Sequence, residues 1–340
     1  MNRFAILFTI SVLLIGLIVW ETTRVGTVEA TRGFNPHMLG NLVGPDRCAE
    51  CHESEQLVWQ ESRHQLGFKE MHRSPLAKEI GQKLGIRRIK SAPECMTCHY
   101  TPEERRGKLR AAHGVSCESC HGAGREWAPI HDDFGGAELT LLTESEEHRR
   151  ERHERCEDLG MKLPSDVVDL GRQCFDCHMV SDERLVNVGG HPTGGAFELL
   201  TWTQGEIRHN FTGGKKNEEA APERRRRLYV FGQLLLAEAA VRDLSLATED
   251  GPYRTQARER LVAATAKVSE LSKKLPALMG ASGVLAGITG ESPDEALSDA
   301  LKKLGAEIEA LSEGEESDWS AIDDMLPDAS SYRGTPRETR

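Results

Sequence analysis

Four segments of the sequence place two cysteines and a histidine in the order Cys-x-x-Cys-His, at residues 48–52, 95–99, 117–121 and 174–178. In this spacing both thiols can add to the vinyl groups of a haem, and the adjacent histidine can bind the iron from the proximal side. Each segment therefore predicts a covalently attached c-type haem, and we call the segments motifs one to four. The predicted attachment residues and proximal ligands are Cys48, Cys51, Cys95, Cys98, Cys117, Cys120, Cys174 and Cys177, with His52, His99, His121 and His178.

A single motif of this kind could be a chance match, a redox dithiol or half of a zinc site. Four motifs favour four haems, because paired zinc knuckles do not require a histidine after each cysteine pair. The ninth cysteine, Cys156, is expected to be an inert thiol. With eight of nine cysteines in the motifs, the pattern does not predict a disulfide framework.

The second axial position of each iron separates an electron carrier from a catalyst, because two histidine ligands close the iron to substrates. Of the thirteen histidines, four belong to the motifs, which leaves nine possible distal ligands. The expected distal ligands are His64, His113, His131, His191 and His209. Two histidines lie in a highly charged segment and are expected to be solvated, namely His148 and His153, and the roles of His37 and His72 stay open. Three methionines are expected to pack rather than to bind iron, namely Met38, Met71 and Met179.

The composition is poor in apolar residues for a chain of 340 residues, at 38% with a mean hydropathy of -0.47. Haem could supply part of the missing apolar mass of the core. The net charge of -11 disfavours nucleic acid as a partner. A solvated acidic surface is the first interpretation of this charge, and docking of a basic redox partner by electrostatic steering is the alternative.

An apolar run without charges spans residues 4–20, after a short start that contains Arg3. The run is at the short end of what spans a bilayer, and it is longer than the usual core of a signal peptide. Residues 1–30 are therefore expected to be an uncleaved signal anchor or a cleaved signal peptide. Both send the rest of the chain to the periplasm or another extracytoplasmic space, and the anchor would also bind the membrane.

The predicted fold is mainly α with extensive coil. Residues 31–213 carry every motif and are expected to form a tetrahaem domain of short helices and loops, including helices at about 53–69 and 145–158. Residues 214–313 are expected to form a helical hairpin or bundle. The acidic residues 314–340 are expected to be disordered.

Helical spacing of apolar residues begins after Pro222 and predicts three amphipathic helices. The third is expected to start with Ser292 as its cap and Pro293 as its first residue. The run 224–227 of four arginines is expected to lie on a solvated helix start, with partner docking as the alternative. These helices could pack on the haem domain or pair with a second copy of the chain in a homo-oligomer.

Two stretches of the sequence resemble the tetrahaem cytochrome c-554 type. They are residues 59–64, which read Trp-Gln-Glu-Ser-Arg-His, and residues 114–122, which read Gly-Val-Ser-Cys-Glu-Ser-Cys-His-Gly. The resemblance covers roughly residues 45–210 and does not reach the C-terminal helices. Proteins of this type carry electrons away from hydroxylamine oxidoreductase in nitrifiers.

The resemblance implies an assignment of distal ligands. By analogy His64 would serve the third haem and His131 the fourth, while the first haem would take His209 in preference to His191. The second haem of the family is five-coordinate and open. This chain departs from the family pattern by having His113 directly before Gly114, and either His113 or His191 could close the second haem.

Together these patterns predict an electron-transfer protein that passes electrons through four closely packed haems between redox partners. The partners implied are a hydroxylamine-oxidoreductase-like donor or a quinol-linked complex. The alternative is an enzyme that acts on a small nitrogen or sulfur species at one open haem, with a histidine, Asp132 or Asp133 as proton donor.

Overall fold

The computed structural model describes residues 40–194, 196–211, 215–314 and 318–339. Within these ranges no helix has both the length and the apolar character needed to cross a bilayer. The apolar run at residues 4–20, with the anchor or signal peptide expected there, lies outside the described residues. The prediction of a mainly α fold is confirmed, since the described strands form one two-stranded hairpin.

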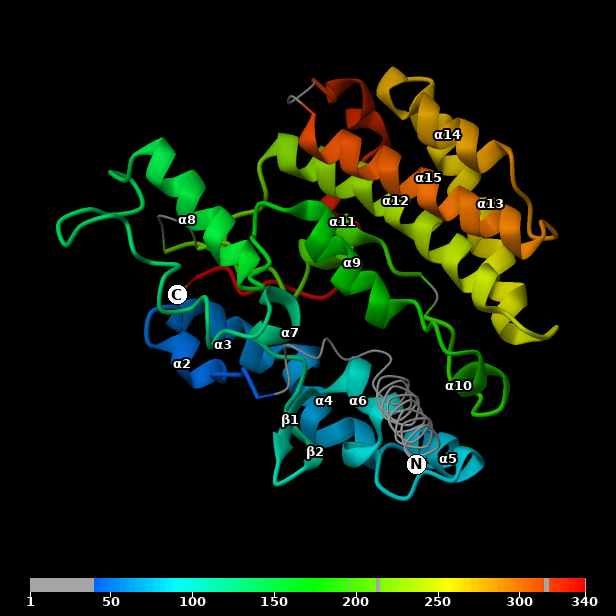
Figure 1. The fold of residues 1–340 in the computed structure, drawn as a ribbon, viewed down its shortest axis with the longest axis horizontal. Helices are drawn as coiled ribbons and strands as arrows, with labels where there is room; N and C mark the ends of the chain where they lie inside the picture. Colours follow the sequence, from blue (N-terminus) through cyan, green and yellow to red (C-terminus); the bar gives the residue numbers. More distant parts are fainter. Residues whose placement is uncertain (1–39, 195, 212–214, 315–317, 340) are drawn as a thin grey trace, which may run out of the picture.

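The part of the chain that carries motifs one to three consists of short elements. They are α2 (Pro45–Ala49), α3 (Glu53–Glu61), α4 (Arg63–Glu70), η2 (Met71–Arg73), α5 (Pro75–Leu84), η3 (Ile89–Ser91), α6 (Pro93–His99), β1 (Thr101–Arg105), β2 (Lys108–His113) and α7 (Cys117–His121). In Figure 1 these elements occupy the lower half of the molecule, with α2 and α5 on opposite sides. The antiparallel strands pair Arg105 with Lys108 and turn through Arg106 and Gly107, which both have positive φ.

The single helix expected at about 53–69 is in fact two helices. Ser62 is extended, with a ψ of 158°, and its hydroxyl donates to the carbonyl oxygen of Trp59 at 2.7 Å. Serine readily makes such local bonds to the backbone, and this one ends α3. The break redirects the chain immediately before His64.

The charged helix α8 (Glu146–Asp158) is confirmed and begins at Ser145, whose hydroxyl accepts from the backbone N–H of His148. The buried carboxylate of Glu144 anchors its inner side, because Arg152 donates to it at 2.6 and 2.8 Å. A hydrogen bond from Arg152 is the main reason that the pKa of Glu144 falls to about 2. Cys156 on the same helix is fully buried, as expected of an inert thiol.

The second half of the chain builds a helical bundle on the helix that carries motif four. Its elements are α9 (Val167–His178), α10 (Glu183–Asn187), α11 (Leu199–Thr203), α12 (Pro222–Leu246), α13 (Pro252–Ser272), η4 (Pro276–Leu278), α14 (Met279–Ala286) and α15 (Asp294–Glu313). The buried helix α12 lies at the centre and contacts α9, α11, α13 and α15. The expected C-terminal bundle is therefore present, and it packs on the haem-bearing part of the same chain.

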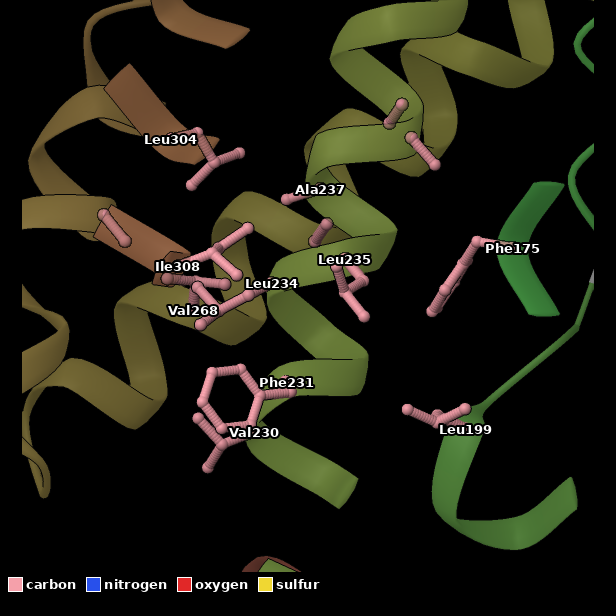
Figure 2. Packing of buried hydrophobic residues seen from close by; sticks show 14 of the residues in the cluster. Phe175, Leu199, Val230, Phe231, Leu234, Leu235, Ala237, Val268, Leu304 and Ile308 are labelled. Atoms are coloured by element: carbon pink, nitrogen blue, oxygen red, sulfur yellow. The ribbon is translucent and has the colours of Figure 1, made fainter. Parts of the chain in front are cut away.

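One hydrophobic core joins α9 to the bundle. On one side of α12, Leu235 faces Phe175 and Leu199, and on the other side Val268 and Ile308 close the bundle, as Figure 2 shows. A Cβ on Gly171 would lie 2.5 Å from a methyl group of Leu235, so only glycine permits α9 to approach α12 this closely. The motif-four helix and the bundle thus form one packing unit.

Two details of the bundle differ from the sequence predictions. The helix α15 begins at Asp294 with Pro293 at its cap position, and the hydroxyl of Ser292 instead accepts from the backbone N–H of Thr289. The arginines at 224–227 are half-buried, and they bond other parts of the chain where a solvated face was expected. Arg226, for example, makes a two-pronged bond to Asp323 at 2.6 and 2.8 Å.

The expectation that residues 314–340 are disordered is wrong for residues 318–339. This segment contains η5 (Ser320–Met325) and η6 (Ala329–Ser331), and its Trp319 and Ile322 are buried in the bundle core. Beyond η6 it runs back toward the haem-bearing part, seen as the red trace that ends near α2 and α3 in Figure 1. Burial of the apolar side chains of Trp319 and Ile322 stabilises the ordered segment, although its acidic composition favours disorder.

Candidate haem-binding sites

Each Cys-x-x-Cys-His motif lies on a short helical turn. Motifs two and three lie on α6 and α7, motif four ends α9, and motif one begins in α2 and ends at His52, the residue before α3. Residues three apart share one face of a helix, so each turn presents its two thiols together, with the histidine next in line. This is the local geometry that double attachment of one haem requires.

Every motif histidine faces a second histidine from elsewhere in the chain. The ring centres are 6.3 Å apart for His52 and His131, 6.3 Å for His64 and His178, 6.1 Å for His99 and His191, and 6.3 Å for His121 and His209. An iron bound between two imidazoles separates their centres by about 6 Å, since each metal–nitrogen bond is about 2 Å and each nitrogen lies about 1 Å from its ring centre. All four pairs therefore have the spacing of two axial ligands of one iron.

Backbone carbonyl oxygens orient the facing histidines. The Nδ1 atom lies 2.6 Å from the oxygen of Ala128 in His131, 2.7 Å from that of Pro192 in His191, and 2.7 Å from that of Ile207 in His209. Since a carbonyl oxygen can only accept, Nδ1 carries the hydrogen and Nε2 keeps its lone pair. Histidines that bind metals commonly donate their second nitrogen in this way.

Burial favours the neutral form, which is the form that binds metal, in four of the eight paired imidazoles. It lowers the pKa of His99, His121 and His178 to about 4, with a further contribution from the facing histidine in each case. Burial also lowers the pKa of His64. Aromatic rings complete the surroundings of His178, with Phe197 stacked at 4.4 Å and Trp202 edge-on at 4.9 Å between ring centres.

The pairing differs from the assignment implied by the resemblance. His64 faces motif four and not motif three, His131 faces motif one and not motif four, and His209 faces motif three and not motif one. The chain around His64 does lie beside motif three, because the His64 carbonyl oxygen accepts from Val115 at 3.1 Å. Its side chain nevertheless points away from motif three to α9, which sequence proximity could not indicate.

His113 is not opposite any motif histidine in the described part of the chain. It ends β2, where it is paired with Thr101 in the register, and its Nε2 lies near Gly44. The histidine that faces His99 is His191, which lies in the loop that follows α10. His148 bonds Glu144, and neither His72 nor His153 makes a ring contact with a motif histidine, while His37 lies outside the described residues.

The methionines agree with the packing role expected of them where they are described. Met179 is fully buried in the main core, and Met71 packs beside Met96 and Tyr100. Met38 lies outside the described residues. Zinc would need about four ligands at one point, and the described residues contain no group of three histidine, cysteine or acidic side chains placed to hold a metal ion.

The motifs form a row in space whose order differs from their order in sequence. Motifs two and four touch, with the Cys98 sulfur 3.9 Å from the Asp176 oxygen and the Cys177 sulfur 3.8 Å from the Thr97 oxygen. The motif-three helix α7 packs on α9, and α2 of motif one packs on α7. The spatial order is therefore two, four, three, one.

Comparison with known proteins agrees with this reading of the motifs. Residues 47–122, which contain motifs one to three, match the family described as cytochrome c554 and c-prime. The chain is also 29% identical over 106 residues to a protein named cytochrome c-554 from Nitrosomonas europaea. The two matches support a relation to cytochromes of the c-554 type. This similarity in turn supports covalently bound c-type haem.

The similarity to the Nitrosomonas europaea cytochrome c-554 is partial. The alignment covers 28% of this chain and 43% of the relative, so the chain spans less than half the length of that curated protein. No solved structure matches the chain significantly. The family match does not extend to motif four, the bundle or the C-terminal segment of the chain.

The sequence analysis did not single out Glu118, which lies inside motif three. Its carboxylate is 2% exposed and accepts the backbone N–H groups of Val43, Gly44 and Gly124 at 2.9, 2.9 and 2.7 Å. It therefore ties the entry of motif one to the exit of motif three. The sequence did contain a signal for this role, namely a glutamate between two haem-attaching cysteines. An ionised side chain at such a position needs either water or several hydrogen-bond donors.

The sequence analysis also gave no role to the C-terminal segment, which holds the loop that carries His209. The Arg333 carbonyl oxygen accepts from Glu206 at 2.8 Å, and Arg208 donates to the Glu338 carboxylate at 2.8 Å. A Cβ on Gly205 would lie 2.0 Å from the Arg333 oxygen, so the two backbones are in direct contact. The residues on both sides of this contact fix the position of the histidine that faces motif three.

Proposed function

We propose that the chain is a tetrahaem c-type cytochrome that carries electrons between redox partners outside the cytoplasm. The observation that carries the proposal is the set of four histidine pairs, each with one motif histidine and one distal histidine at 6.1–6.3 Å. When bound, haem supplies one-electron cycling between iron(III) and iron(II). The extracytoplasmic location rests on the apolar N-terminal run in the sequence.

The residues of the chain have three roles in this proposal. The eight motif cysteines would hold the cofactors, and the eight paired histidines would bind the irons, two histidines to each. The contacts between motifs two, four, three and one set the path along which an electron would move. His52 and Cys51 of motif one are exposed, so this end of the path meets solvent directly.

The proposal of an electron carrier, and not of an enzyme, depends on His191. The resemblance implies an open second haem, whereas the ring of His191 stands 6.1 Å from that of His99. With both axial positions taken, no iron would accept a substrate. The partners we propose are therefore redox proteins, with a hydroxylamine-oxidoreductase-like donor or a quinol-linked complex as the classes implied by the resemblance.

Electron paramagnetic resonance of the haem-loaded full chain tests this function. We expect four low-spin haems, and in the His191→Ala variant one of the four should become high-spin and bind nitric oxide. His148→Ala is the matched control, because His148 bonds Glu144 and faces no motif histidine, so its spectrum should not change. A high-spin haem of full stoichiometry in the unaltered protein would overturn the carrier and favour the enzyme that acts on a small nitrogen or sulfur species.

A further inference from the structure

The segment from residue 69 to residue 90 is strongly basic in an otherwise acidic protein. It contains seven lysines and arginines against two glutamates, whereas the whole chain has a net charge of -11. We call its seven cationic side chains the basic patch. They are Lys69, Arg73, Lys78, Lys83, Arg87, Arg88 and Lys90.

The fold gathers the basic patch around one hollow on the surface. The elements η2, α5 and η3 border an open pocket of about 650 Å³. Four of the seven patch side chains line it, namely Lys78, Arg87, Arg88 and Lys90, together with His72. Six of the seven side chains are exposed, and Lys90 is half-buried over the ring of Phe68, 3.3 Å from its centre. The positive charges therefore face outward from one region.

The chain itself leaves most of these charges uncompensated. Among the described residues, the only patch member in an ion pair is Lys83, which bonds Glu79 at 2.8 Å. After burial, the charges of Lys90, Arg73 and Lys78 are what lower the pKa of His72. That direction is the expected result of a positive local potential.

The basic patch lies beside motif two, at one end of the row of motifs. The helix α6, which carries motif two, contacts η3. The loop that bears His191 packs on α5, where Gly189 is close to Leu84 and Ile80. The patch therefore borders both elements that supply the histidines of the motif-two site.

The opposite end of the row carries the opposite charge. Five exposed carboxylates lie around motif one, namely Asp46, Glu50, Glu53, Asp132 and Asp133, and of these Glu50 is paired with Arg47. In Figure 1 the helices α2 and α5 lie on opposite sides of the haem-bearing part. An electron path with one acidic and one basic end can distinguish its two partners by charge.

From this arrangement we propose that the basic patch docks an acidic one-electron carrier protein at the motif-two end, an inference that rests on the proposed electron-transfer function. The patch has the composition of an interface, since Leu76 on α5 is 47% exposed among the charges and offers an apolar contact inside a charged rim. The net charge of the chain repels an acidic protein, so the local patch must supply the attraction and the orientation.

Isothermal titration calorimetry with an oxidised plant-type ferredoxin, a small acidic one-electron carrier, tests the docking without requiring electron flow. We expect binding to weaken at least about tenfold between about 10 mM and about 150 mM salt, as the Debye length shortens from about 30 Å to about 8 Å. The triple variant Arg73→Glu, Arg87→Glu and Arg88→Glu should lose about tenfold or more at low salt. The control Lys273→Glu, Lys302→Glu and Lys303→Glu changes the net charge equally on the exposed bundle and should bind almost as the unaltered chain does.

Several results would overturn the docking proposal. They are no binding, binding that strengthens with salt, equal losses in both triple variants, or a preference of the patch for phosphatidylserine vesicles over ferredoxin. Haem content and spin state measured on the same samples separate this proposal from the function on which it rests. Four low-spin haems without salt-sensitive binding would refute the docking proposal and leave the carrier function standing. Binding that depends on the patch, together with one open haem, would refute the carrier function and leave the docking proposal standing.

Discussion

Replacing Glu118 by glutamine tests whether one buried carboxylate holds motifs one and three together. The two residues have the same shape, so the change isolates the charge. One carboxylate oxygen accepts from Val43 and Gly124 and the other from Gly44, and glutamine can supply only one accepting oxygen. The amide of glutamine would keep two weakened bonds and would turn a donor toward the third N–H group.

Hydrogen bonds to a charged group contribute about 1.5–3 kcal/mol each. Loss of one such bond and weakening of two should lower the free energy of unfolding by about 2–4 kcal/mol, which corresponds to a fall in Tm of about 3–6 °C for a chain of this length. Thermal unfolding of the haem-loaded chain, followed by far-ultraviolet circular dichroism, measures the change.

The matched control for this experiment is Glu50→Gln inside motif one. Its carboxylate is 58% exposed and pairs only with Arg47 at the surface, so we expect a change within about 0.5 kcal/mol. If Glu118→Gln unfolds at the same temperature as this control, the three backbone bonds do not stabilise the junction of the two motifs and the reasoning is refuted.

Three further predictions concern other parts of the fold. Ending the chain at Gly314 should convert one haem of four to high spin, because the lost segment holds the loop of His209, and an unchanged resonance spectrum would contradict this. Since the folded pKa of Glu144 is about 2 against an ordinary 4.5, its contribution to stability is present above pH 4.5 and is lost as the pH falls toward 2, so Glu144→Gln should show a smaller acid-induced drop in Tm than the unaltered chain. Gly171→Ala should destabilise the chain by about 1–3 kcal/mol through the clash with α12, whereas Gly283→Ala, with open space around it in α14, should stabilise it by up to about 1 kcal/mol in the same denaturant titration.

The sequence was sufficient to predict the motifs and the type of chemistry. A Cys-x-x-Cys-His turn is local, so its residues must lie together wherever the chain folds. The four distal histidines that the structure places opposite the motifs were also among the predicted candidates, because few other histidines lay outside charged or solvated segments. Their partners could not be predicted, since a pairing such as His64 with His178 depends on the tertiary position of α4 relative to the end of α9 and on no local pattern.

His113 shows why proximity along the chain misleads. It precedes motif three by four residues, yet the hairpin register sends it toward Gly44. The C-terminal segment shows the same limit for composition. Its acidic residues suggested disorder, but Trp319 and Ile322 find a preformed apolar surface on the bundle, and nothing in the segment itself reveals that this surface exists.

The C-terminal segment also bears on the order in which the protein can mature. Its last residues bond partners that were synthesised long before them, and Arg337 reaches Glu61 across 276 positions of the chain. Contacts of such long range cannot form until residues 333–338 have been synthesised. The loop that brings His209 over motif three therefore lacks this tether for as long as the C-terminal segment has not been made.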